Sequence, residues 1–95
     1  MKTPSAELDS LRKAIDQVDR RILDLLEERV RLVLAVGDYK RKNSLPVYDP
    51  ERERSLLERL SGAARPPLDG DTVRRVFERL IDESRRIEQH HVQQR

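Results

Sequence analysis

Apolar residues recur at steps of three and four along the N-terminal part of the chain. The series consists of Leu8, Leu11, Ile15, Val18, Ile22, Leu25, Leu32 and Val36. This spacing places them on one face of a helix and predicts a single long helix from about Ala6 to Lys42. Arg29 interrupts the series at a position where the spacing predicts an apolar residue.

The segment "KNSLPVYDP" ends this pattern, because Pro46 restricts the residue before it to extended geometry. Asp49 followed by Pro50 is a typical helix start, with Asp49 as the N-cap. A second helix is therefore predicted from Pro50 to about Ala63. It would bury a group of leucines: Leu56, Leu57 and Leu60.

A third helix is predicted from about Asp69 or Asp71 to about His91. Its apolar stripe consists of Val73, Val76, Phe77, Leu80, Ile81, Ser84 and Ile87. The fold class is therefore all-α, with three helices per subunit in one domain that spans residues 1–95. We expect residues 1–5 and 91–95 to fray.

The length of the first helix predicts a homodimer. At 1.5 Å per residue it would be about 50 Å long, whereas a compact chain of this size is about 30 Å across. Apolar residues make up 36% of the 95 positions and charged residues 40%. Because one chain has little apolar material for a core, a second copy should cover the exposed stripe.

Composition narrows the possible functions. The net charge of +2 is small and the two signs are interleaved, which argues against binding to nucleic acid. There is no apolar run of membrane-spanning length and no signal-peptide core, so no membrane association is expected. The lack of cysteine excludes disulfides and is consistent with a reducing cytoplasm. His90 and His91 diverge on a helix and form a poor metal pair, so no metal site is predicted.

Several polar residues lie on the faces that should be buried. Arg29 and Lys40 are eleven residues apart and share a helix face, about 16 Å apart along the axis. On the third helix, Ser84 and Glu88 lie one turn apart on the inner face. On the second, Arg52 precedes Leu56 by one turn, with Glu53 beside it.

Each of these residues has an ordinary structural explanation. An arginine within an apolar helix face, such as Arg29, can fix the packing register of two helices or extend its charged end to solvent. Lys40 can complement a helix dipole, Arg52 and Glu53 can be surface charges, and Ser84 can be a small packing residue. Together, however, they predict a polar pocket for a small polyanion with carboxylates. No strong nucleophile accompanies them, which suits binding alone or a reaction that needs only positioning and electrostatic stabilisation.

The chain resembles the all-helical class (type II) of chorismate mutases from about Leu8 to Gln89. The resemblance rests on "LRKAIDQVDRRILDLLEERVRLVLAVGDYK", "PVYDPERERSLLERL" and "FERLIDESRRIEQ", which include the motifs "VGxxK" and "DxxRE". It implies an intertwined dimer with two shared active sites. It also implies the Claisen rearrangement of chorismate to prephenate in one concerted step, without a cofactor.

The resemblance also implies the role of each site residue. Arg29 and Lys40 would bind substrate carboxylates, and Lys40 would also bind the ether oxygen. Glu53 and the backbone at Asp49 would accept from the ring hydroxyl, with Arg52 and Ser84 assisting at a carboxylate. Val36, Leu56 and Ile81 would form the apolar wall. Arg12 lies about 25 Å along the helix from Arg29 and would serve the site of the partner subunit.

Many members of this family have glutamine where this chain has Glu88, and others have glutamate. An amide can donate to the ether oxygen, whereas a carboxyl can do so only when it is protonated. Arg85 adjoins the pocket wall with no assigned effect. Two alternative functions stay open from the sequence, an isochorismate pyruvate lyase on the same fold and a non-catalytic dimeric helical module that regulates another enzyme.

Overall fold

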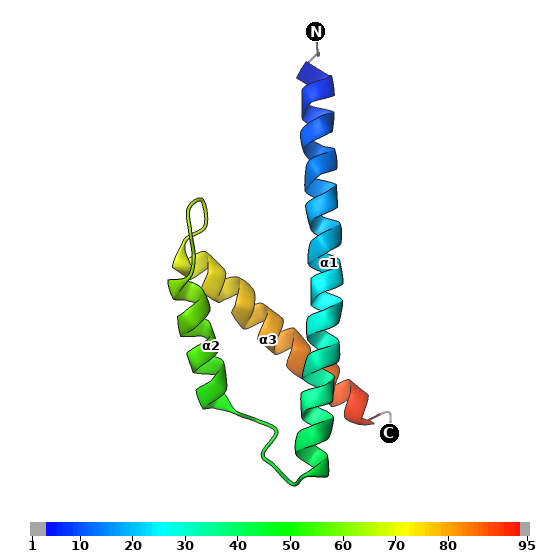
Figure 1. The fold of residues 1–95 in the computed structure, drawn as a ribbon, viewed down its shortest axis with the longest axis vertical. Helices are drawn as coiled ribbons and strands as arrows, with labels where there is room; N and C mark the ends of the chain where they lie inside the picture. The colour runs from blue at the N-terminus through cyan, green and yellow to red at the C-terminus, as the bar shows by residue number, and fades with distance from the viewer. Residues whose placement is uncertain (1–3, 94–95) are drawn as a thin grey trace. The chain divides into compact units, whose positions relative to one another are not determined.

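The computed structural model describes residues 4–93, and these form three helices joined by two loops (Figure 1). They are α1 (Pro4–Lys42), α2 (Pro50–Gly62) and α3 (Gly70–Gln93). Every predicted helix is present, and each boundary lies within about two residues of its predicted position. The all-α prediction is therefore confirmed. The residues divide into two compact units, Met1–Leu32 and Val33–Arg95.

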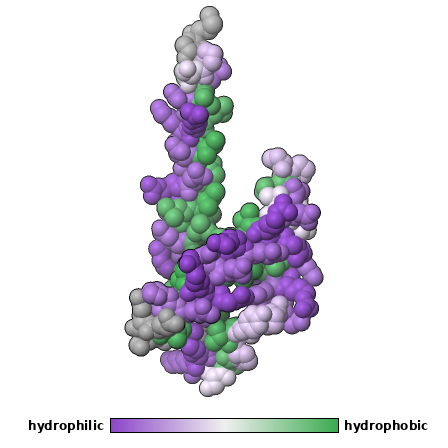
Figure 2. All heavy atoms as spheres, turned by 180° about the vertical axis from the view of Figure 1, so that it is seen from behind, coloured by the Kyte–Doolittle hydropathy of each residue, from purple (hydrophilic) through white to green (hydrophobic). Residues whose placement is uncertain are grey.

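The first unit consists of the N-terminal part of α1. Its apolar stripe is exposed in the single chain, with Leu11 64% and Leu25 62% accessible. Figure 2 shows the stripe as a continuous apolar line along the helix. A lone helix of this kind is stabilised by little besides its own backbone hydrogen bonds, because its apolar face meets nothing within the unit.

In the second unit, α2 and α3 pack against each other. Leu56, Leu57 and Leu60 of α2 are half-buried, as are Phe77, Leu80 and Ile81 of α3. Among residues 4–93 no apolar side chain is fully buried in the single chain. Among the residues whose burial is described, 4–92, Gly37 of α1 and Ser84 of α3 are the two that are buried.

Helices α2 and α3 each begin after an aspartate that caps the N-terminus. Asp49 Oδ1 accepts from the backbone N–H of Arg52 at 3.1 Å, and Pro50 follows at the first helical position. Asp69 Oδ1 accepts from the N–H of Thr72 at 2.7 Å. Because this hydrogen bond favours the charged carboxylate, it lowers the pKa of Asp69 below its ordinary value of 3.8.

The helices extend further toward the chain ends than predicted. Pro4 and Ser5 are the first residues of α1, and α3 continues through His91 to Gln93. The remaining positions of the predicted frayed segments, 1–3 and 94–95, lie outside the described residues. No helix within residues 4–93 is long and apolar enough to cross a membrane.

Candidate functional site

Gly37 leaves room for a side chain of α3 beside the last turns of α1. A Cβ at this position would lie 2.7 Å from Glu88 Oε1 and 3.2 Å from an Arg41 guanidinium nitrogen. A distance of 2.7 Å is too short between a methyl carbon and a carboxylate oxygen, so a methyl group at position 37 would force the Glu88 carboxylate to move. The glycine of the "VGxxK" motif therefore leaves room for the Glu88 carboxylate against the α1 backbone.

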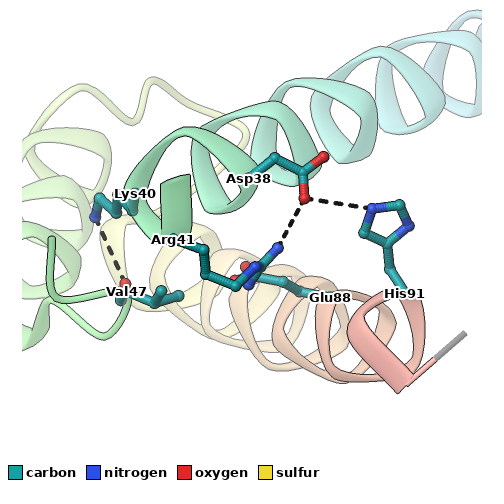
Figure 3. Close-up of polar contacts among 6 residues, drawn as sticks. All are labelled: Asp38, Lys40, Arg41, Val47, Glu88 and His91. Carbon is teal, nitrogen blue, oxygen red and sulfur yellow. Dashed lines mark hydrogen bonds and ion pairs between the residues drawn. The ribbon is translucent and has the colours of Figure 1, made fainter. Parts of the chain in front are cut away.

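Glu88 belongs to a cluster of four charged or titratable side chains (Figure 3). Arg41 Nη1 donates to Glu88 Oε1 at 3.3 Å, and Arg41 Nη2 donates to Asp38 Oδ1 at 2.9 Å. His91 Nε2 lies 3.5 Å from the same Asp38 oxygen, at ion-pair distance. We call these residues, Asp38, Arg41, Glu88 and His91, the Arg41 cluster. The guanidinium thus bridges a carboxylate of its own helix and one of α3.

Lys40 points to the opposite side, toward the loop that follows α1 (Figure 3). Its Nζ donates to the backbone carbonyl of Val47 at 3.5 Å. The loop reverses direction at Ser44, whose φ of 57° is left-handed, and the N–H of Leu45 donates to the Lys40 carbonyl at 2.7 Å. This turn brings Val47 back along the last turn of the helix, within reach of the lysine.

The start of α2 positions Glu53 against α3. The N–H of Glu53 donates to the Asp49 carbonyl at 3.2 Å, and its carboxylate accepts a short hydrogen bond from Arg85. The Arg85 guanidinium also lies over the Tyr48 ring, 5.3 Å from its centroid. The hydrogen bond to Glu53 is the main reason that the pKa of Arg85 is raised above its ordinary value.

Ser84 lies one turn before Glu88 on the same face of α3 and is 7% exposed. The three predicted wall residues differ in burial, since Leu56 and Ile81 are half-buried whereas Val36 is 52% exposed.

The predicted site residues are divided between the two units. The second unit contains Lys40, Asp49, Arg52, Glu53, Ser84 and Glu88. Arg12 and Arg29 belong to the first unit, where Arg12 is exposed and Arg29 is half-buried. The helical rise puts these two arginines about 25 Å apart along α1. One small ligand cannot contact both of them within one chain.

The sequence did not predict a role for Asp38 or Arg41. It also did not predict the contact of His91 with Asp38, because His91 was expected to lie in the frayed C-terminal segment. The spacing contained a usable signal, because Gly37 and Arg41 are one turn apart and therefore share a face. A glycine inside a long helix often marks a close approach by another element. The charged residue one turn away could then be expected to meet that element.

The arrangement offers hydrogen-bond donors and cations rather than a nucleophile. Within residues 4–93 there is no group of three or more histidine, cysteine, aspartate or glutamate side chains placed to hold a metal ion. Lys40 can bind an anion, and Ser84, Glu53 and Glu88 can hydrogen-bond its hydroxyl or ether oxygens. Such a site supports binding or electrostatic catalysis.

Comparisons with known proteins agree on one family. The family model described as chorismate mutase type II matches residues 11–89. The T-protein of Enterobacter agglomerans is 44% identical over 80 residues, which is 83% of this chain and 21% of that protein. The chain thus spans about a fifth of that relative's length. A chorismate mutase of Methanocaldococcus jannaschii is 28% identical over 93% of this chain and 90% of its own length.

Solved structures of the same kind are similar in fold. Chorismate mutase (Form II) from Thermus thermophilus has a TM-score of 0.83 and 37% identity, covering 87% of this chain and 94% of that one. Chorismate mutase from Helicobacter pylori, solved in complex with prephenate, has a TM-score of 0.81 and 29% identity, covering 90% and 93%. With a family match that spans most of its length, this chain belongs to the chorismate mutase type II family.

Proposed function

We propose that the chain converts chorismate to prephenate by a Claisen rearrangement. The observation that carries the proposal is the family match over residues 11–89, which includes every predicted site residue from Arg12 to Glu88. The similar Helicobacter pylori enzyme was solved with prephenate, which is the product that we propose here. The reaction breaks a C–O bond and forms a C–C bond within one molecule, so it needs no cofactor and no covalent intermediate.

The cations would bind the substrate and stabilise the charge that develops in the transition state. Arg29 would bind one carboxylate, while Arg52 and Ser84 would assist at a carboxylate. Lys40 would bind a carboxylate and the ether oxygen, which gains negative charge as the C–O bond breaks. The Lys40 ammonium donates to a backbone carbonyl at 3.5 Å, so its full charge is available to an anion.

The acidic groups would hydrogen-bond the ring hydroxyl and the ether oxygen of the substrate. Glu53 and the backbone at Asp49 would accept from the hydroxyl, and their position at the start of α2 is fixed by the N-cap. Glu88 would donate to the ether oxygen in its protonated form. Its place beside Gly37 leaves the carboxyl close to the α1 backbone.

The working form would be a homodimer with intertwined first helices and shared active sites. Two observations support this, the exposed apolar stripe of α1 and the separation of about 25 Å between Arg12 and Arg29. A second copy would cover the stripe, and Arg12 of the partner subunit would complete each site. We propose a cytoplasmic location for this dimer, in keeping with the lack of cysteine.

A direct assay tests the proposal. Purified protein is mixed with chorismate, the loss of chorismate is followed by absorbance, and prephenate is identified by mass spectrometry and by its acid-catalysed conversion to phenylpyruvate. Isochorismate is supplied in a parallel reaction. Turnover of chorismate to prephenate supports the mutase. Release of pyruvate from isochorismate without turnover of chorismate would indicate the lyase, and no reaction with either would favour a binding module.

A further inference from the structure

Arg85 of α3 makes three contacts, and the proposed mechanism gives this residue no role. Its Nη2 donates a short hydrogen bond to Glu53 Oε1, and its Nη1 lies 3.7 Å from Asp82 Oδ1. The guanidinium also lies over the Tyr48 ring, 5.3 Å from the centroid. These partners belong to α2, to α3 and to the loop before α2. Contacts from three directions restrict both the direction and the plane of a rigid, planar group.

The Arg85–Glu53 pair differs from the surface ion pairs of α3. Glu53 lies 32 residues away from Arg85 on another helix, and 40% of the arginine side chain and 31% of the glutamate side chain are exposed. Arg79, in comparison, pairs with Glu83 four residues further along α3 and is 77% exposed. Water screens the less exposed pair less. The hydrogen bond from Arg85 can therefore hold the Glu53 carboxylate in one direction.

We propose that Arg85 is a positioning residue for Glu53, holding its carboxylate where it can accept a hydrogen bond from the ring hydroxyl of the substrate. This inference rests on the proposed function, in which Glu53 accepts that bond. The N–H of Glu53 donates to the Asp49 carbonyl at 3.2 Å. That bond sets the position of the Glu53 backbone, and the bond from Arg85 sets the direction of its side chain. Arg85 acts through Glu53 and does not touch the substrate.

The pairing leaves Glu53 able to accept from a hydroxyl. Arg85 uses Oε1, and an ionised carboxylate has about four acceptor positions on its two oxygens. The guanidinium also offsets the negative charge of Glu53, which would otherwise repel the carboxylates of the substrate. The ring hydroxyl takes no part in the C–O bond that breaks or the C–C bond that forms. A misplaced acceptor should therefore raise KM more than it lowers kcat.

The experiment compares chorismate with 4-deoxychorismate, which lacks the ring hydroxyl. We define the hydroxyl preference of a protein as its kcat/KM for chorismate divided by its kcat/KM for 4-deoxychorismate. Both substrates are assayed on the same sample, so a loss of folded or dimeric protein lowers both values alike and leaves the ratio unchanged. The ratio thus separates a positioning role from a merely structural one.

The proteins compared are wild type, Arg85→Leu, Arg85→Lys, Glu53→Ala and the double variant Glu53→Ala/Arg85→Leu. The matched control is Arg79→Leu, which removes an arginine from an exposed pair on the same helix. Circular dichroism and thermal melting establish that each variant is folded.

Arg85→Leu should lower the hydroxyl preference about tenfold, because a hydrogen bond to a charged acceptor is lost or weakened. The change should lie mainly in KM for chorismate. Arg85→Lys should lose less, because it keeps a charged donor, and Arg79→Leu should match wild type. The double variant should have the same hydroxyl preference as Glu53→Ala, because without the carboxylate Arg85 has nothing to position.

Three results would overturn the inference. Equal losses for both substrates in Arg85→Leu would assign Arg85 to packing or to direct binding of a substrate carboxylate. A raised hydroxyl preference would show that Arg85 competes with the hydroxyl for Glu53. A further fall in the double variant below Glu53→Ala would show that Arg85 does not act through Glu53.

Failure of the proposed function can be distinguished from failure of this inference. If wild type does not turn over chorismate, the mutase proposal fails. Isothermal titration calorimetry with chorismate and 4-deoxychorismate then gives the hydroxyl preference as a ratio of Kd values, and the same outcomes decide the role of Arg85. If wild type binds neither compound, the inference is overturned together with the proposed function.

Discussion

Replacing Gly37 with alanine should lower the catalytic rate while leaving the melting temperature almost unchanged. The added Cβ would lie 2.7 Å from Glu88 Oε1, 3.0 Å from its carboxyl carbon and 3.2 Å from Arg41 Nη2. Ordinary contact begins at 3.4 Å, so Glu88 Oε1 must retreat by about 0.7 Å. The atoms that must move are the ends of two flexible side chains, so the backbones of α1 and α3 can stay in place.

The stability terms for this substitution nearly cancel. Alanine is favoured over glycine inside a helix by about 0.5–1 kcal/mol. Weakening the half-buried Arg41–Glu88 pair costs about 1 kcal/mol. The melting temperature should therefore stay within about 4 °C of wild type. The rate should fall much further, because displacing a catalytic group by about 1 Å can cost about a hundredfold. We expect a loss in kcat of about tenfold or more.

The assay measures kcat and KM for chorismate together with the thermal melt. Gly62→Ala is the matched control, because it is the same substitution in a helix and its Cβ would meet nothing within 4 Å. The control should keep wild-type kcat. If Gly37→Ala also kept wild-type kcat from pH 5 to 9, the position of the Glu88 carboxyl beside α1 would be irrelevant to the rate. A fall of more than about 10 °C in melting temperature would show that the backbones cannot stay in place.

Three further results are expected. Refolding a mixture of Arg12→Ala and Arg29→Ala chains should restore one intact site per heterodimer, and heterodimers without recovered activity would contradict shared sites. Arg29→Leu should abolish turnover, because the proposed ligand of a substrate carboxylate is lost, yet keep or raise the melting temperature, because leucine continues the apolar face of α1. Loss of folding would assign Arg29 a structural role. Asp69→Ala should destabilise the protein near neutral pH. Because the pKa of Asp69 is lowered in the folded state, the stabilisation by its carboxylate is present above about pH 4 and is lost as pH falls through the folded-state pKa. Equal decreases in the free energy of unfolding in urea at pH 7 and pH 3 would contradict this.

The helices could be predicted from the sequence because their signals are local. A long apolar period defined α1, and an aspartate followed by proline defined the start of α2. The predicted helix boundaries were least accurate at the two ends of the chain. Pro4 fits the first turn of a helix, where its missing N–H costs nothing, and His91 is held by a contact with α1 that spacing within α3 could not reveal.

The site was only partly predictable, because its pairings join distant parts of the sequence. Ser84 and Glu88 could be placed on the inner face of α3 from spacing alone. That Glu53 would pair with Arg85, or Glu88 with Arg41, depends on how α2 and α1 approach α3. Helical periodicity gives no distance between residues that are 32 or 47 positions apart. Gly37 was a local signal in the sequence that a side chain from another helix lies against α1.

These pairings bear on how an anionic substrate could be attracted to a site that contains carboxylates. Glu53 and Glu88 would each repel chorismate if they faced it alone and ionised. Each has an arginine partner on a neighbouring helix, Arg85 for Glu53 and Arg41 for Glu88, and these pairs largely offset the negative charge. Lys40 donates to a backbone carbonyl instead of a carboxylate, so its positive charge is not neutralised by that contact. In the proposed mechanism the attraction for the substrate would therefore come from Lys40 together with Arg29 and Arg52. A carboxylate paired with an arginine can still accept a hydrogen bond, and it can donate one only when it is protonated.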